Sequence, residues 1–90
     1  MEDNKVKIIE YTSKTCPKCK QLELMLKDYN VNVEKINTST DEGFEDAVNN
    51  GVLSIPTLIL YENGKEVNRM VGNNPERLRR FIHSEPIVQG

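Results

Sequence analysis

A continuous apolar run, Leu58-Ile59-Leu60-Tyr61, constrains the fold of this 90-residue chain more than any other feature. A strand with one wet face alternates apolar and polar residues, whereas an uninterrupted apolar strand is covered on both faces. The pair Asn63-Gly64 follows the run and is a strong hairpin signal, with a return strand from Lys65 to Val71. We therefore expect a central strand with an antiparallel neighbour, in a sheet flanked by helices.

The rest of the chain alternates between strand and helix patterns. Strands are expected at Val6 to Tyr11 and Val31 to Ile36, each rich in β-branched residues. One helix begins near Pro17, and a second lies between the capping residues Thr38 to Asp41 and Gly51, with an apolar stripe that we expect to pack inward, namely Phe44, Ala47 and Val48. A last helix follows Pro75. The order β-α-β-α-β-β-α predicts an α/β fold with a four-stranded mixed sheet, parallel first and antiparallel last.

Length and composition indicate one domain over residues 1–90, with a core at about 6–83 and a tail at 84–90. The net charge of −2 gives no electrostatic reason to expect a nucleic acid or a membrane as partner. No apolar run approaches the roughly 20 residues of a membrane-spanning helix. The polar segment from Met1 to Lys5 does not resemble a signal peptide, so we expect a cytoplasmic protein. We expect a monomer, because the predicted surface has no long apolar patch.

Cys16 and Cys19 are the only cysteines, and they lie at the predicted junction between the first strand and the first helix. In the cytosol a lone pair at this spacing is more often catalytic or metal-binding than structural. Cys19 shares the apolar stripe of Leu22 and Leu26, so it should be buried, whereas Cys16 should be exposed at the helix N-terminus.

The predicted chemistry is thiol–disulfide exchange. The helix N-terminus stabilises a thiolate at Cys16, and nearby positive charge adds to this effect, from Lys14, Lys18 and Lys20. Cys16 is expected to attack a substrate disulfide, and Cys19 to resolve the mixed disulfide. The redox-active disulfide Cys16–Cys19 is then the reactive group, and no further cofactor is expected.

Cys19 must lose its proton before it attacks. Glu10 ends the first strand among apolar residues, and Lys35 lies in the neighbouring strand-like segment. A partly buried Glu10 near Lys35 is a candidate general base. The alternative is a strand-end carboxylate in water or in an ion pair.

Two segments, Tyr11 to Cys19 and Ser54-Ile55-Pro56-Thr57, resemble the thioredoxin-fold oxidoreductases, and the resemblance extends from Val6 to about Ile82. It implies the thioredoxin fold and a cis Pro56 facing the cysteines, with the backbone of Ile55 free to pair with an extended substrate. It places Gly72 in a nearby loop, Glu10 at the buried acidic position of the family and Lys35 at its lysine. The substrate-binding set that we expect is Pro17, Lys18, Ile55, Pro56, Thr57 and Gly72.

The size resembles that of glutaredoxins, while the stretch from Pro56 to Gly72 resembles thioredoxin. The chain has no tryptophan before Cys16, and its segment Gly72 to Pro75 lacks the Gly-Gly-x-Asp pattern of glutaredoxins. We expect a small thioredoxin-like reductase of protein disulfides, supplied with electrons by a reductase or by glutathione.

Three alternatives remain. The first is a glutathione-dependent glutaredoxin. The second is a metal-binding module. Two cysteines and the lone His83 fall short of the four ligands of a structural zinc site, so we expect no metal within one chain, and zinc or an iron–sulfur cluster shared between two chains is the form of this alternative that stays open. The third is a partner protein that uses the fold and not its cysteines.

Overall fold

The computed structural model describes residues 6–83, which form one four-stranded sheet. The strands are β1 (Val6–Thr12), β2 (Val33–Asn37), β3 (Thr57–Glu62) and β4 (Lys65–Val71), in the spatial order β2-β1-β3-β4. β1 runs parallel to β2 and antiparallel to β3, and β3 runs antiparallel to β4. The mixed sheet and the order β-α-β-α-β-β-α predicted from the sequence are confirmed. The expected tail at 84–90 and the segment Met1 to Lys5 lie outside the described residues.

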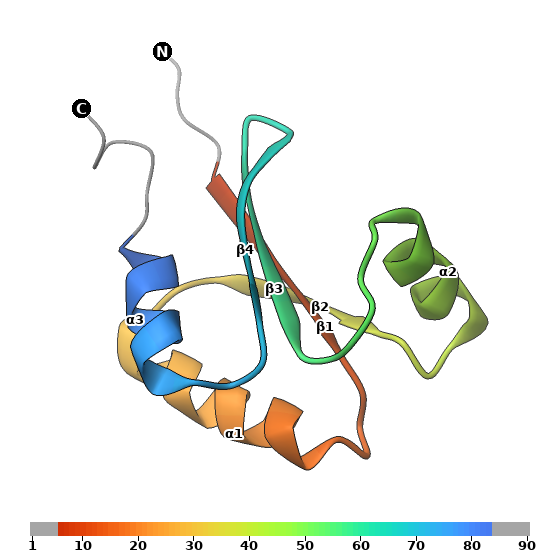
Figure 1. The fold of residues 1–90 in the computed structure, drawn as a ribbon, viewed down its shortest axis with the longest axis horizontal. Helices are drawn as coiled ribbons and strands as arrows, with labels where there is room; N and C mark the ends of the chain where they lie inside the picture. Colours follow the sequence, from red (N-terminus) through yellow and green to blue (C-terminus); the bar gives the residue numbers. More distant parts are fainter. Residues whose placement is uncertain (1–5, 84–90) are drawn as a thin grey trace.

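Three helices cover the two faces of the sheet. They are α1 (Pro17–Leu26), which a 3-10 turn η1 (Lys27–Tyr29) extends, α2 (Asp41–Asn49) and α3 (Pro75–Ile82). Figure 1 shows α2 on the opposite side of the sheet from α1 and α3. None of the helices in the described part of the chain has the length and apolar character needed to cross a membrane.

The central strand β3 separates two apolar cores. Leu58 and Leu60 point toward α1 and α3, where they join a cluster that contains Ile8, Leu22, Leu26, Met70, Leu78 and Phe81. Ile59 points the other way and packs with Tyr11, Ala47 and Val52 beneath α2. Leu58 and Ile59 are completely buried. The expectation of a strand covered on both faces is confirmed.

The hairpin between β3 and β4 forms at Asn63-Gly64, as predicted. Asn63 has a φ of 54° and Gly64 a φ of 87°. Two successive positive φ values are typical of the tight turns that match the twist of paired strands, and Asn-Gly adopts them most readily. The second strand begins later than predicted: β2 starts at Val33, where it first pairs with β1, and not at Val31.

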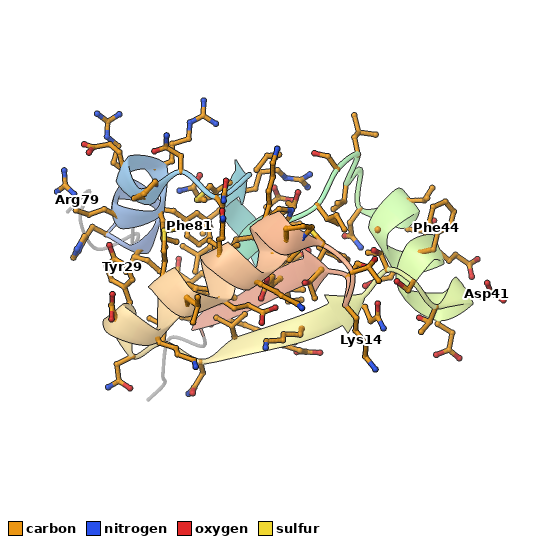
Figure 2. The ribbon with its side chains drawn as sticks, turned by 90° about the horizontal axis from the view of Figure 1, so that it is seen from below. Lys14, Tyr29, Asp41, Phe44, Arg79 and Phe81 are labelled. Atoms are coloured by element: carbon orange, nitrogen blue, oxygen red, sulfur yellow. The ribbon has the colours of Figure 1, made fainter. Side chains whose placement is uncertain are left out.

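The prediction that Phe44 and Val48 pack inward is wrong. Phe44 is 62% exposed and Val48 is 56% exposed, and Figure 2 shows the Phe44 side chain on α2, turned away from the strands. The helix faces the sheet along the line from Gly43 to Ala47, which are its buried residues. Each step along a helix turns by about 100°, so Phe44 and Val48 lie beside this line and not on it.

Candidate active site

Cys16 occupies the N-cap of α1, directly after the loop that leaves β1. Its backbone is extended (φ −101°, ψ 109°), and Pro17 begins the helix. The backbone N–H of Cys19 donates to Cys16 Sγ over 3.2 Å. The first amides of a helix have no partner within the helix, and its dipole favours a negative charge there. The half-buried sulfur of Cys16 therefore lies where a thiolate is stabilised.

Cys19 lies one turn into α1 and is completely buried. Both cysteines are free thiols in this structure. Burial raises the pKa of the Cys19 thiol, and the hydrogen bond with Cys16 raises it further, while the Thr12 hydroxyl and the Ser13 backbone oppose both effects. Cys19 therefore holds its proton at neutral pH and needs a base before it can attack.

Glu10 lies on the same face of β1 as Ile8, which packs against Leu22 of α1. Its side chain is completely buried, not partly buried as the sequence led us to expect, and neither carboxyl oxygen has a hydrogen-bond partner within the described part of the chain. Burial raises the pKa of this carboxyl to about 7, with a further increase from Glu23 and a decrease from Lys35. A carboxyl with this pKa gains and loses a proton readily at neutral pH.

Lys35 is the direct neighbour of Glu10 across the β1–β2 pair. Its ammonium group nevertheless pairs with another carboxylate, since Lys35 Nζ lies 3.3 Å from Glu23 Oε1. The hydroxyl of Thr12 donates to the other oxygen of Glu23 over 3.4 Å. Glu23 was not among the site residues predicted from the sequence, although its position four residues after Cys19 places the two on adjoining turns of one helix face.

A hollow of about 530 Å³ opens beside this group of charges. Its lining combines three lysines with one glutamate and three shorter residues of β1, the β1–α1 loop and β2, namely Lys14, Lys20, Lys35, Glu23, Thr12, Ser13 and Asn37. Solvent therefore reaches the Glu23–Lys35 pair, whereas Glu10 lies buried behind it.

The loop before β3 carries the cis Ile55–Pro56 bond that the family resemblance implied. The N–H of Gly72 donates to the Pro56 carbonyl over 2.8 Å, so the two loops lie in contact as expected. Gly72 has a φ of +98°, a conformation that strains any residue with a side chain. The hydroxyl of Thr57 donates to the Ser54 carbonyl over 2.7 Å and so closes the turn around Pro56.

Strand register brings these loops to the same end of the sheet as the cysteines. Tyr11, near the end of β1, is paired with Thr57 at the start of β3, and Thr57 is paired with Val71 at the end of β4. The loops that carry Cys16, Pro56 and Gly72 therefore leave the sheet at one edge (Figure 1).

An apolar hollow of about 190 Å³ adjoins this edge, and the sequence analysis did not predict it. Ile55 lines it together with residues of α2 and of the loops before and after that helix, namely Thr38, Phe44, Ala47, Val48, Val52, Leu53 and Ser54. The Leu53 side chain is 97% exposed. Such a surface beside the loop of Pro56 offers apolar contacts to another molecule.

Among residues 6–83, no three side chains of His, Cys, Asp or Glu are grouped as metal ligands. His83 follows α3 and packs edge-on against the Tyr29 ring, with 6.5 Å between centroids. Tyr29 lies beyond the C-terminal end of α1, far from the cysteines at its start.

Comparison with known proteins decides the family. The thioredoxin family model matches residues 1–84. The chain belongs to the thioredoxin family. A thioredoxin of Chlamydia caviae is 37% identical over 80 residues, which cover 84% of this chain and 78% of the relative. Thioredoxin-1 of Saccharomyces cerevisiae is 29% identical over 82 residues, covering 88% of this chain and 80% of the relative.

Solved thioredoxin structures share the fold. A thioredoxin of Nicotiana alata superposes with a TM-score of 0.72 at 30% identity, covering 89% of this chain and 72% of the other. The thioredoxin of Fasciola hepatica superposes with a TM-score of 0.76 at 24% identity, covering 88% of this chain and 79% of the other. The predicted membership of the thioredoxin-fold oxidoreductases is confirmed, and the protein is a protein-disulfide oxidoreductase. The glutaredoxin alternative is not favoured.

Proposed function

We propose that this protein reduces disulfide bonds of other proteins, with Cys16 as the attacking and Cys19 as the resolving residue. The observation that carries the proposal is the asymmetry of the pair. Cys16 is half-buried and accepts a hydrogen bond from the first turn of α1, whereas Cys19 is fully buried behind it. Only the sulfur of Cys16 is placed to meet a large substrate.

In the first step, the Cys16 thiolate attacks one sulfur of the substrate disulfide. A bond forms between Cys16 Sγ and that sulfur, the substrate S–S bond breaks, and the other substrate sulfur leaves as a thiolate that takes a proton from water. The positive charges of the exposed Lys18 and of the nearby Lys14 and Lys20 favour the thiolate that attacks.

In the second step, Glu10 in its ionised form accepts the proton of the Cys19 thiol. The Cys19 thiolate attacks Cys16 Sγ, the mixed disulfide breaks, and the second substrate thiolate leaves. Two electrons have then passed to the substrate, and the protein holds a Cys16–Cys19 disulfide. The buried, unpaired carboxyl of Glu10 on the α1 side of β1 supports this role.

The substrate is proposed to bind as an extended segment across the loops that surround the cysteines. Pro17 and Lys18 are exposed beside Cys16, and the half-buried Ile55 offers its backbone for strand-like pairing. Pro56 and Gly72 shape the adjoining loops, and Thr57 supports the Pro56 turn. The apolar hollow beside Ile55 would receive a side chain of the substrate.

A reductase protein is the proposed source of electrons, and the protein is proposed to act as a monomer in the cytosol. A glutathione carboxylate would need free amides at the start of α3. The Arg77 N–H there already donates to the Asn74 side chain over 3.0 Å. This arrangement argues for a reductase over glutathione.

Trapping with a model substrate tests the proposal. Reduced Cys19→Ser, mixed with insulin, is expected to accumulate a covalent complex that dithiothreitol releases, because the resolving thiol is missing. Cys16→Ser is the matched control and should form no such complex. Trapping by Cys16→Ser and not by Cys19→Ser would reverse the two roles, and trapping by neither would refute the exchange mechanism.

A further inference from the structure

Glu23 lies at the edge of the buried site and has no part in the exchange steps described above. Its side chain is 29% exposed and forms an ion pair with Lys35 over 3.3 Å. Its second oxygen accepts the Thr12 hydroxyl. These contacts join α1 to β2 and to β1, the strand that carries Glu10, so the carboxylate of Glu23 is held in place beside the buried site.

The charges that act on Glu10 come from two elements. β2 supplies the Lys35 ammonium, and α1 supplies the Glu23 carboxylate. On its other side Glu10 is paired with the apolar Leu58 of β3. Lys35 is the register neighbour of Glu10, yet neither oxygen of Glu10 has a hydrogen-bond partner among residues 6–83. The ammonium nearest to Glu10 is thus engaged by another carboxylate.

We propose that Glu23 is a positioning residue, which holds the Lys35 ammonium away from Glu10 and so sets the proton affinity of the buried carboxyl. A free lysine side chain at position 35 would turn toward Glu10, because an opposite charge stabilises the ionised carboxylate. Glu10 would then be a weaker base at neutral pH. The functional consequence rests on the proposed role of Glu10 as the base for Cys19.

The proton affinity of Glu10 can be measured without any substrate. We would follow the carboxyl carbon of Glu10 by NMR in the reduced, ¹³C-labelled protein from pH 4 to pH 10 and compare three proteins. In Glu23→Gln the amide keeps an acceptor for Thr12 but loses the charge, and the titration midpoint of Glu10 should fall by about one pH unit. The matched control Glu34→Gln removes a carboxylate next to Lys35 that pairs with Lys7, and it should leave the midpoint unchanged.

A double-mutant cycle separates positioning from simple repulsion between the two carboxylates. If Glu23 acts through Lys35, Glu23→Gln should lower the titration midpoint of Glu10 much less in a Lys35→Met background than in the wild type. An equal fall in both backgrounds would overturn the proposal, as would an unchanged midpoint in Glu23→Gln.

The same variants distinguish this inference from the proposed function. The rate at which Cys19 releases insulin from Cys16 should follow the midpoint of Glu10, so its pH profile in Glu23→Gln should shift downward with the NMR titration. If Glu23→Gln lowers the titration midpoint of Glu10 but does not move the pH profile of the release rate, the positioning role of Glu23 stands and Glu10 is not the base for Cys19. A kinetic profile that follows an unchanged Glu10 midpoint would refute the inference and support the base.

Discussion

Glu10 occupies the environment least suited to its side chain. Burial without a compensating hydrogen bond disfavours the charged form of a carboxyl group, and both oxygens of Glu10 lack a hydrogen bond from any residue between Val6 and His83. The sequence predicted a buried tendency, because Glu10 follows an apolar strand pattern. It could not predict complete burial or the engagement of Lys35 by Glu23, since both depend on how α1 packs over the strands.

This burial makes the stability of the protein depend on pH. The pKa of Glu10 in the folded protein is about 7, above its ordinary value of 4.5. Between pH 4.5 and about 7, Glu10 is therefore protonated in the folded state and ionised in the unfolded state. The free energy of unfolding falls as the pH rises through this range. Glu10→Gln should abolish this fall in stability, because glutamine does not ionise. At pH 8 the variant should be more stable than the wild type by about 3 kcal/mol, and near pH 4 the two should be equal.

Urea unfolding of the reduced protein at both pH values measures this difference. Glu34→Gln, on the exposed side of β2, is the control and should show no gain at pH 8. A Glu10→Gln variant that is equally or less stable than the wild type at pH 8 would contradict the account of the buried carboxyl.

Helix α2 is held to the sheet by small residues and by polar contacts at its end. Gly43 and Ala47 face the strands, and the Tyr11 hydroxyl donates to Asp46 over 3.1 Å. Arg69 of β4 donates to the Asn50 carbonyl over 2.9 Å. The sequence predicted the position of this helix from its capping residues. It did not predict which face of the helix packs against the sheet, because the apolar side chains of Phe44 and Val48 lie at the surface.

The glycine in α2 should resist a substitution that usually favours helices. Alanine stabilises an exposed helix position by about 1 kcal/mol relative to glycine. A Cβ at Gly43, however, would lie 1.9 Å from the Asn37 carbonyl oxygen, which is backbone and cannot turn aside. We expect Gly43→Ala to lower the free energy of unfolding by about 2 kcal/mol. Thermal unfolding measures the change, and a gain in stability would show that α2 does not approach β2 so closely. The exposed Glu45→Ala, on the same helix, is the control.

Across the whole molecule, one edge of the sheet gathers the features that a protein substrate would meet. The loops with Cys16, Pro56 and Gly72 lie there, and the apolar hollow adjoins them. The apolar run and the Asn-Gly turn were sufficient to predict the hairpin and the central strand, because these are local patterns. The same holds for the placement of an exposed-side Cys16 and a buried Cys19 at the start of α1, while their reactivity stays a prediction. The hollow and Glu23 depend on contacts between distant segments, for which no local pattern exists.

The role of the hollow can be tested at its most exposed residue. Leu53 is 97% exposed, so Leu53→Ser should leave the stability unchanged. If a protein substrate covers the side chain, its loss should raise KM for insulin roughly fivefold, equivalent to about 1 kcal/mol of lost apolar contact. Reduction of a small disulfide such as 5,5′-dithiobis(2-nitrobenzoate) should not change. Leu24→Ser, an exposed leucine of α1 outside the hollow, is the matched control, and an equal effect of both variants would contradict a substrate contact at Leu53.

A redox titration of the Cys16–Cys19 pair tests the central claim most directly. The protein would be equilibrated in glutathione buffers of graded potential, and its free thiols would be alkylated and counted by mass spectrometry. We predict one two-electron transition from dithiol to intramolecular disulfide, at about −270 mV as in thioredoxin. A pair that forms no intramolecular disulfide in any buffer, and yields only glutathione adducts, would contradict the claim that these two cysteines act as one redox centre.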